Sequence, residues 1–318
     1  GSDDRYATME KKKISLSVVL ATYNEDEHID RCLSSVVGIA DEIVVVDGGS
    51  TDQTHRVLSS WKPNFSFRWF EHKGNRSQGR NAAISSTKIS IIAITDAGCT
   101  PEREWLERIT KRLIANDCDV ASGYYSPQAQ TNFEKAAAAY MLVMPEHINP
   151  KLFLPATRSM ALKKSIWEKA GRFDERLSDN EDYVFAKKLQ CIGAKIFFEK
   201  DAIVRWLPPK TWGAFLKQVW RFAYGDCFAG IVRPKVMFIF VRWLVFVILG
   251  LMSFSLFFLT MFLYLFWAWA KNQKHVASFS AVYLLPTMQL ATDLVVMVGS
   301  VQGLVVKIQK KIYAKTNH

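Results

Sequence analysis

The sequence predicts an α/β fold in which a doubly wound, mostly parallel sheet is followed by a C-terminal membrane-associated helical region. Three observations support this prediction. Short apolar runs rich in β-branched residues alternate with helical stretches of roughly 10–15 residues, which is typical of a parallel sheet covered by helices. Polar residues cluster where the predicted strands end. The final quarter of the chain is apolar and basic.

The expected elements follow one another regularly up to residue 122. Residues 15–21 predict a strand buried on both faces, because the run is apolar and rich in β-branched residues. Asn24, followed by Glu25 and Asp26, predicts the start of a helix to about Val37, as an N-cap with an acidic first turn does. Apolar runs that stop at turn residues predict the remaining elements. In order, these are strands at 43–46, 65–71, 89–95 and 118–122, and helices that begin near 51, 80 and 101.

The next part of the chain, residues 124–180, is mixed and rich in loops. A helix is expected at 136–144, a short strand at 159–162 and a short helix at 164–170. An amphipathic helix is expected from Asn180 to about Cys191, followed by Gly193 as the glycine that ends it. We therefore expect the sheet domain to span residues 13–230, after a tag or disordered segment at 1–12.

Residues 231–318 are expected to form the membrane-associated region. Residues 236–270 contain one charge, Arg242. A single helix of this length would be roughly 52 Å long against a hydrocarbon core of about 30 Å, so we expect a hairpin of two short spans with a turn near Ser253. Residues 287–313 carry apolar side chains at helical spacing and polar ones largely on another side, which favours an interfacial helix. The alternative is a buried helical pair in a soluble protein, which so long an apolar run disfavours.

Charge and cysteine content narrow the class of protein. The chain has 41 Lys and Arg against 30 Asp and Glu, a net charge of +11. It has no zinc-finger, RNP or basic-aromatic pattern, so we expect no nucleic-acid partner and assign the charge to a membrane surface. Basic residues flank the apolar region, which predicts that the sheet domain lies on the cytosolic side. The five cysteines include no Cys-x-x-Cys pair, which fits a reducing compartment.

Two carboxylates follow predicted strands directly, Asp47 after the second strand and Asp96 after the fourth. The carboxyl edge of an open α/β sheet is where ligands bind. A carboxylate there can bind a ribose hydroxyl or share a hard cation with substrate phosphates, and such a cation improves a diphosphate leaving group. Arg76 and Arg80 lie between the two strands, and Arg80, at an expected helix start, suits an anion. The alternative is that all four residues only form turns, caps or solvated surface.

These residues belong to motifs that resemble those of the family 2 glycosyltransferases of GT-A fold. Residues 18–25 read VVLATYNE and residues 41–52 read DEIVVVDGGSTD. Residues 79–84 read GRNAAI, and residues 95–99 read TDAGC at the place of the DxD motif. Asn180-Glu181-Asp182 resembles the Glu-Asp motif, and residues 218–222, QVWRF, resemble the QxxRW motif. Each motif is weak alone, but their order is a specific signal over about residues 14–230.

The resemblance implies a nucleotide-sugar site at the strand ends. Thr22, Tyr23, Glu25 and Asp47 would line the nucleotide base and ribose. Arg80 would order this pocket. Asp96 would approach the ribose and a Mg²⁺ or Mn²⁺ ion on the diphosphate.

The resemblance also implies a catalytic pair, Glu181 and Asp182, with Asp182 as the general base that takes the proton of the acceptor hydroxyl. A carboxylate beside another at a helix start can have the raised pKa that a base needs. The alternative is simple charge compensation of the helix N-terminus. Gln218 and Arg221 would contact the acceptor or the diphosphate. Arg158 suits a phosphate of a lipid-linked acceptor, or alternatively an ion pair with a surface carboxylate.

Two residues depart from the family pattern. Gly98 stands where the DxD motif has its second acid, so one expected metal ligand is missing. Phe222 stands where the QxxRW motif has Trp, which weakens the case for processive polymer synthesis.

The resemblance therefore implies an inverting glycosyltransferase at the cytosolic face of a membrane. The expected donor is a UDP-sugar, with GDP-mannose next, and the expected acceptor is lipid-linked. A processive polysaccharide synthase is one alternative, and an inactive membrane-attached sugar-nucleotide sensor or scaffold is another. A nicotinamide oxidoreductase is excluded, because no GxGxxG follows the first strand.

Overall fold

The computed structural model describes residues 14–61 and 67–316. The expected segment at 1–12 and the start of the strand expected at 65–71 lie outside these residues. One eight-stranded sheet has the order β3-β2-β1-β4-β7-β6-β8-β5. Its strands are β1 (Leu16–Thr22), β2 (Glu42–Asp47), β3 (Phe67–Glu71), β4 (Ile91–Ile94), β5 (Cys99–Pro101), β6 (Val120–Pro127), β7 (Met160–Lys163) and β8 (Ile196–Trp206).

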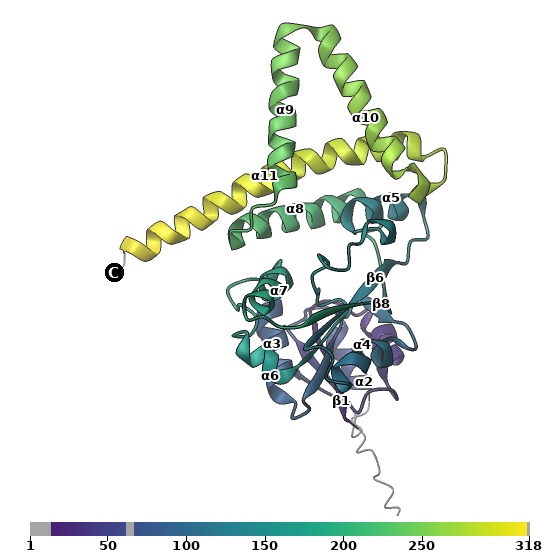
Figure 1. Ribbon diagram of the computed structural model, residues 1–318, viewed down its shortest axis with the longest axis vertical. Helices are drawn as coiled ribbons and strands as arrows, with labels where there is room; N and C mark the ends of the chain where they lie inside the picture. Colours follow the sequence, from purple (N-terminus) through teal and green to yellow (C-terminus); the bar gives the residue numbers. More distant parts are fainter. Residues whose placement is uncertain (1–13, 62–66, 317–318) are drawn as a thin grey trace, which may run out of the picture.

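Helices cover both faces of this sheet (Figure 1). They are α1 (Ile29–Val36), α2 (Thr54–Ser60), α3 (Arg76–Ser86), α4 (Trp105–Ile114), α6 (Lys164–Lys169) and α7 (Glu181–Cys191). Between α4 and α6 the chain also forms α5 (Asn132–Met141), which packs against the C-terminal helices, and the 3₁₀ turn η1 (Pro145–His147). The strands β3, β2, β1 and β4 pair in parallel, whereas β7 runs antiparallel to both β4 and β6, and β5 antiparallel to β8. The sheet is therefore mixed, with its parallel half at the N-terminal strands, and the predicted α/β class is confirmed.

Strand β8 is an element that sequence reasoning missed. Its apolar residues are interrupted by the charged segment Glu199-Lys200-Asp201, so no continuous apolar run marks it. In the sheet, Gly123 pairs with Glu199 but the next residue, Tyr124, pairs with Ile203. The intervening residues bulge out of the parallel ladder with β6, which lets one strand carry charges in its middle.

Helices α1 and α3 begin at other residues than the sequence predicts, and the structure shows the reason for each. Asn24 does not start α1: its backbone is left-handed, with φ 54°, and its Oδ1 accepts a hydrogen bond from the Thr51 N–H at 2.8 Å. It joins the loops after β1 and β2 instead, and α1 begins at Ile29. Helix α3 begins at Arg76, because Asn75 and Gln78 form a capping box there. Arg80 is therefore one turn inside α3 and not at its N-terminus.

Four helices complete the chain: α8 (Trp212–Ala229), α9 (Pro234–Met252), α10 (Phe254–Val276) and α11 (Ala281–Thr316). Helices α9 and α10 form a hairpin that points away from the sheet and turns at Ser253, whose Oγ caps α10 (Figure 1). Helix α11 crosses the base of this hairpin and packs along α8 (Figure 1). It includes the helix expected at 287–313 and begins six residues earlier. By length and apolar composition, α9, α10 and residues 281–310 of α11 each suffice to cross a membrane.

The hairpin turns most of its apolar side chains outward. Phe238, Leu251 and Phe254 are each at least 70% exposed, and α9 has one buried residue, Phe246. Exposed apolar surface of this extent is unusual for a soluble protein and suggests membrane association. Two charges of this region are paired with each other: Asp293 on α11 is buried and accepts hydrogen bonds from Arg242 Nη2 (2.6 Å) on α9 and from Tyr264 Oη (2.6 Å) on α10. One carboxylate therefore joins all three apolar helices.

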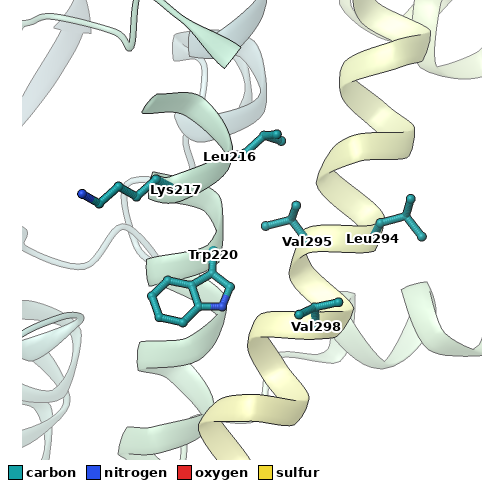
Figure 2. Close-up of a pocket in the computed structure, with 6 residues that line it drawn as sticks. All are labelled: Leu216, Lys217, Trp220, Leu294, Val295 and Val298. Atoms are coloured by element: carbon teal, nitrogen blue, oxygen red, sulfur yellow. The ribbon is translucent and has the colours of Figure 1, made fainter. Parts of the chain in front are cut away.

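Helices α8 and α11 pack closely because glycine allows it. A Cβ added to Gly303 would lie 2.3 Å from the backbone oxygen of Tyr224, so no larger residue fits there without separating the helices. Nearer the middle of α8 the two helices leave a groove of about 330 Å³ between them. Figure 2 shows Leu216 and Trp220 of α8 on one side of this groove and Leu294, Val295 and Val298 of α11 on the other, with Lys217 pointing away.

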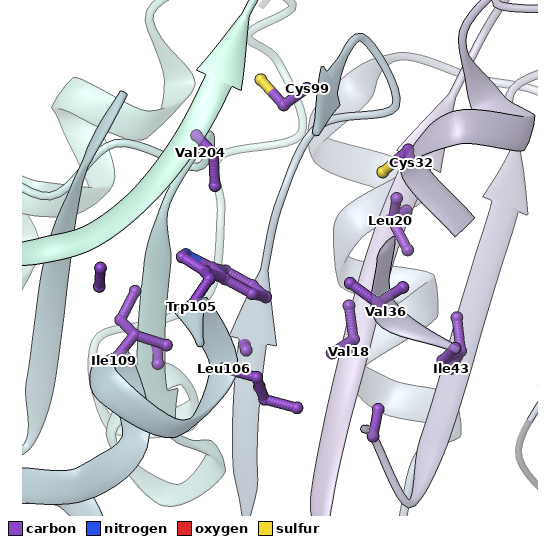
Figure 3. Packing of buried hydrophobic residues seen from close by; sticks show 14 of the residues in the cluster. Val18, Leu20, Cys32, Val36, Ile43, Cys99, Trp105, Leu106, Ile109 and Val204 are labelled. Carbon is purple, nitrogen blue, oxygen red and sulfur yellow. The ribbon is translucent and has the colours of Figure 1, made fainter. Parts of the chain in front are cut away.

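The buried core lies on the two faces of the sheet. One cluster joins the sheet to α1 and α4 around Trp105, whose indole N–H donates to Ser159 Oγ at 2.9 Å (Figure 3). The other joins it to α3, α6 and α7 around Trp167 and Phe185. Because both faces are buried, β1, β2 and β4 read as continuous apolar runs, which is why the sequence reveals them.

Candidate active site

The carboxyl ends of β1 and β2 form one side of the candidate site, where Thr22 and Asp47 pair in register. The buried Asp47 carboxylate accepts hydrogen bonds from the N–H groups of Gly49 (2.9 Å) and Ser50 (2.8 Å), and His55 Nε2 lies 2.7 Å away. Burial raises the pKa of Asp47, but these hydrogen bonds outweigh it, and the pKa lies below its ordinary value. Asp47 is therefore a charged carboxylate that orders the loop after β2.

The other residues predicted for the nucleotide are Thr22, at the end of β1, and Tyr23 and Glu25, on the loop after it. Thr22 is buried, and its hydroxyl has no hydrogen-bond partner among the residues that the structure describes. Tyr23 is 56% exposed, which leaves its ring accessible to a ligand. The Glu25 side chain is half-buried, and burial raises the pKa of its carboxyl group.

Sequence reasoning missed two neighbours of Asp47. Together with His55 and Glu71, Asp47 forms a group whose candidate ligand atoms all lie within 4.8 Å of one another, close enough to hold a metal ion. Glu71 is the last residue of β3, as Asp47 is the last residue of β2. This position at a strand end is the feature by which the sequence could have identified Glu71. His55 lies on α2, and its proximity depends on how that helix packs.

Arg80 brings together two of the predicted site residues from distant parts of the chain. Its side chain is only 3% exposed. Its Nη2 donates to Asp96 Oδ1 at 2.7 Å, and its Nη1 donates to Glu181. Burial raises the pKa of Asp96, but the charges of Arg80, Arg76 and Arg158 and the hydrogen bond from Arg80 together outweigh it, and the pKa lies below its ordinary value. Burial raises the pKa of Glu181, with Asp182 adding to this effect and Arg80 opposing it.

Asp182 follows Glu181 in the first turn of α7 and differs from it in environment. Its side chain is half-buried, and no cation pairs with it within the described residues. Its Oδ1 accepts a hydrogen bond from the Tyr183 N–H at 2.8 Å. The carboxylate therefore stays available to a ligand, whereas Glu181 is committed to Arg80.

A cavity of about 580 Å³ lies over these side chains. Its floor includes Asp96, Glu181 and Asp182, and Arg158 lines it as well. The opposite side comes from the C-terminal helices: Val219, Phe222, Ala223 and Asp226 of α8, Lys235 and Val236 of α9, and Thr292 and Val296 of α11. The cavity thus joins the sheet edge to the apolar helices. Thr22, Tyr23, Glu25 and Asp47 do not line it and form a separate edge.

Arg158 has no ion pair within the described residues, so the alternative of a surface carboxylate partner is not seen. Its guanidinium lies over the rings of Tyr125 and Trp206, with 5.1 Å from Cζ to each ring centroid. Its backbone oxygen accepts a hydrogen bond from Thr95 Oγ1 at 2.9 Å, which fixes it beside Asp96. Arginine that stacks on aromatic rings keeps its N–H groups available for an anion.

The two residues predicted from the QxxRW-like motif do not line the cavity. Arg221 Nη2 pairs with Asp179 Oδ1 at 2.5 Å, and Asp179 in turn lines the cavity. Gln218 is on the same helix, which presents Val219 and Phe222 to the cavity instead. Arg221 therefore lies next to the cavity through Asp179 without lining it.

Sequence reasoning also missed the contact between α8 and the residue before α7. Asn180 adopts a left-handed backbone, with φ 59°, and its Nδ2 donates to Asp226 Oδ1 at 3.0 Å and to the Phe222 oxygen at 2.9 Å. Asp226 also pairs with Arg233, just before α9. These bonds fasten the Glu181-Asp182 turn to the helices that lead into the hairpin.

Two family models match the chain. Residues 17–164 match the one described as glycosyl transferase family 2, and residues 91–294 match the one described as glycosyl transferase family group 2. Among curated proteins, glycosyltransferase AglE of Haloferax volcanii is 26% identical over 222 residues, which are 66% of this chain and 72% of the relative. Poly-beta-1,6-N-acetyl-D-glucosamine synthase of Staphylococcus epidermidis is 24% identical over 66% of this chain, which spans 54% of that synthase.

Among solved structures, the mannosyltransferase PcManGT from Pyrobaculum calidifontis, in complex with GDP-Man and Mn²⁺, superimposes with a TM-score of 0.64. The match covers 91% of this chain and 86% of that one at 18% sequence identity. At this identity the likeness shows a shared fold, which is the GT-A fold together with the helices that follow it.

Proposed function

The chain belongs to the glycosyl transferase family group 2, and from this premise we propose that it transfers a sugar from a nucleotide diphosphate sugar to a hydroxyl group of a lipid-linked acceptor at a membrane surface. The observation that carries the proposal is the 580 Å³ cavity, which has Asp96 and Asp182 on one side and residues of α9 and α11 on the other. An acceptor whose lipid lies in the membrane can enter from the side of those helices. Anchoring both partners at one surface raises the effective concentration of the acceptor.

Asp182 acts as the general base in this proposal. Its carboxylate has no cationic partner within the described residues, whereas Glu181 and Asp96 both pair with Arg80. Asp182 takes the proton of the acceptor hydroxyl as that oxygen attacks the anomeric carbon, and the bond from this carbon to the nucleotide diphosphate breaks. A single displacement of this kind inverts the anomeric configuration. NMR of the product, compared with the donor, tests the inversion directly.

Asp96 is the residue proposed to hold Mg²⁺ or Mn²⁺ together with diphosphate oxygens. The residues fit such an ion, because Asp96 is a carboxylate held below its ordinary pKa and hard cations take oxygen ligands. When bound, the ion neutralises charge that develops on the leaving diphosphate. Arg80 holds the Asp96 side chain in place through Oδ1. The PcManGT complex with GDP-Man and Mn²⁺ supports a metal-assisted reaction in a protein of the same fold.

The donor is proposed to be a UDP-sugar, with GDP-mannose as the second choice. Thr22, Tyr23 and Asp47 form the edge at which the base and ribose bind, and the exposed ring of Tyr23 is accessible to them. The sheet domain is proposed to face the cytosol, because Lys235, Lys271 and Lys274 lie at the ends of the hairpin nearest to it. In the interfacial arrangement we favour, α11 lies along the membrane surface.

The first experiment measures nucleotide release by the full chain purified in detergent. A panel of UDP- and GDP-sugars is supplied with Mn²⁺ or Mg²⁺, with and without a membrane lipid extract. We expect release from one donor, stimulated by lipid and abolished in Asp182→Asn. The matched control is Asp201→Asn, an exposed carboxylate of β8, which we expect to leave release unchanged. Nucleotide binding without release from any donor would instead favour the sensor or scaffold.

A processive polysaccharide synthase is the second candidate, and the similarity to poly-beta-1,6-N-acetyl-D-glucosamine synthase favours it. The two functions differ in the length of the product. Mass spectrometry of the glycan made in the same reaction will show one added sugar for the transferase and a ladder of lengths for the synthase.

A further inference from the structure

Gly98 leaves open the space where the family pattern has an acidic side chain, and the carboxylate of another residue is adjacent to that space. A Cβ built on Gly98 would lie 3.6 Å from Glu25 Oε2 and 3.7 Å from Glu25 Oε1. These are ordinary van der Waals contacts. The end of the Glu25 side chain therefore lies where a side chain at position 98 would extend.

The structure fixes the backbone of Glu25 and leaves its carboxylate without a hydrogen bond or ion pair among the described residues. The Glu25 N–H donates to Thr54 Oγ1 at 2.9 Å, and its backbone oxygen accepts hydrogen bonds from His28 (3.0 Å) and Ile29 (2.9 Å). In the described part of the chain, no hydrogen bond or ion pair reaches its carboxylate oxygens. A half-buried carboxylate that is held in place and unpaired is suited to a cation.

The neighbourhood of Glu25 contains the other carboxylate that a cation would need. Asp96 is close enough for its negative charge to act on Glu25 electrostatically. Two carboxylates near each other repel, and a divalent cation between them removes the repulsion. Mg²⁺ and Mn²⁺ prefer oxygen ligands and share them with substrate phosphates.

We propose that Glu25 supplies, with Asp96, the second carboxylate of the divalent cation site, in place of the acid that is missing at Gly98. This inference rests on the metal-assisted sugar transfer proposed above, and it moves Glu25 from the nucleotide base to the cation. The open space beside Gly98 and the carboxylates of Glu25 and Asp96 fit the ion. The second acid of the DxD pattern is absent at position 98, but Glu25 supplies a carboxylate in its place.

The test measures Mn²⁺ binding directly, by the loss of the electron paramagnetic resonance signal of free Mn²⁺. The full chain in detergent is titrated with Mn²⁺ alone, with UDP and with GDP. We expect Glu25→Ala to weaken Mn²⁺ binding by at least about tenfold, as loss of a ligand does. Glu27→Ala, an exposed carboxylate two residues away, is the matched control and should bind as the unaltered chain does.

A second variant tests the geometry. Removing the Glu25 side chain frees the space beside Gly98, so Glu25→Ala/Gly98→Asp should regain Mn²⁺ affinity. Nucleotide affinity in EDTA should be the same for the unaltered chain and Glu25→Ala, because the role of Glu25 is assigned to the cation.

Three results would overturn the inference: equal Mn²⁺ binding by Glu25→Ala, a loss of nucleotide affinity in EDTA, or Mn²⁺ binding that depends on His55 and not on Glu25. A chain that binds no Mn²⁺ with either nucleotide would overturn it as well. Donor turnover in EDTA would then still decide whether the transferase function stands.

Discussion

Arg80 and Glu181 form a buried ion pair that joins α3 to the first turn of α7, across 101 residues of sequence. Because the same guanidinium holds Asp96, one arginine sets the positions of the proposed metal ligand and of the turn that carries Asp182. The side chains of Arg80 and Glu181 are 3% and 4% exposed, so water does not compensate the loss of either. The proposed site therefore depends on a single buried cation.

Replacing this cation should destabilise the fold. We expect Arg80→Leu to lower the free energy of unfolding by about 3–5 kcal/mol, because it leaves buried carboxylates uncompensated. Arg76→Leu, on the same helix, is the control: its side chain is 50% exposed and lies 3.9 Å from Asp179, so we expect a change within about 1 kcal/mol. Chemical unfolding in detergent measures both. If both variants lose the same free energy of unfolding, the buried Arg80–Glu181 pair contributes no more to stability than the exposed Arg76 does.

Asp47 should make stability depend on pH. Its pKa in the folded chain is below the ordinary 3.8, so the unfolded state binds its proton first as pH falls. Its contribution to stability is complete above about pH 5 and is lost as pH falls through 3.8 toward the lower folded value. Asp47→Asn should therefore reduce the slope of unfolding free energy between pH 3 and 5. An unchanged slope would mean that other carboxylates carry the dependence.

Arg158 should contribute more to binding of the acceptor than to binding of the donor. Arg158→Lys keeps the charge but loses the planar pair of N–H donors and the stacking on Tyr125 and Trp206. We expect the KM for a phosphate-bearing lipid acceptor to rise about 10- to 100-fold, the range for charged hydrogen bonds of 1.5–3 kcal/mol. Arg205→Lys, which pairs with Glu102 outside the cavity, is the control. A rise in donor KM alone would assign Arg158 to the nucleotide diphosphate.

Gly303 tests whether the packing of α11 on α8 shapes the cavity. A Cβ there would lie 2.3 Å from the Tyr224 oxygen, so Gly303→Ala should cost about 1–3 kcal/mol and separate the helices. Turnover with the lipid acceptor should fall, since both helices line the cavity. Gly213→Ala on α8 meets no atom within 4 Å and should be neutral or stabilising by up to about 1 kcal/mol. Thermal unfolding and lipid-stimulated nucleotide release measure the two effects.

The sequence determined the parts of this protein that depend on neighbours along the chain. Continuous apolar runs predicted β1, β2 and β4, and the strand ends predicted the location of Asp47 and Asp96. The apolar length of residues 236–270 predicted two helices that meet near Ser253. These features could be predicted because burial on both faces of a sheet, or in a membrane, requires an apolar composition that the sequence shows directly.

Tertiary structure alone decided which distant side chains meet. Strand β8 is paired in spite of its central charges, because the bulge after Gly123 accommodates them. Arg221 turns to Asp179 and not to the cavity, and Glu25 lies beside Gly98, 73 positions further along the chain. Such contacts depend on how helices and loops pack against the sheet, and no local pattern of residues encodes a packing angle.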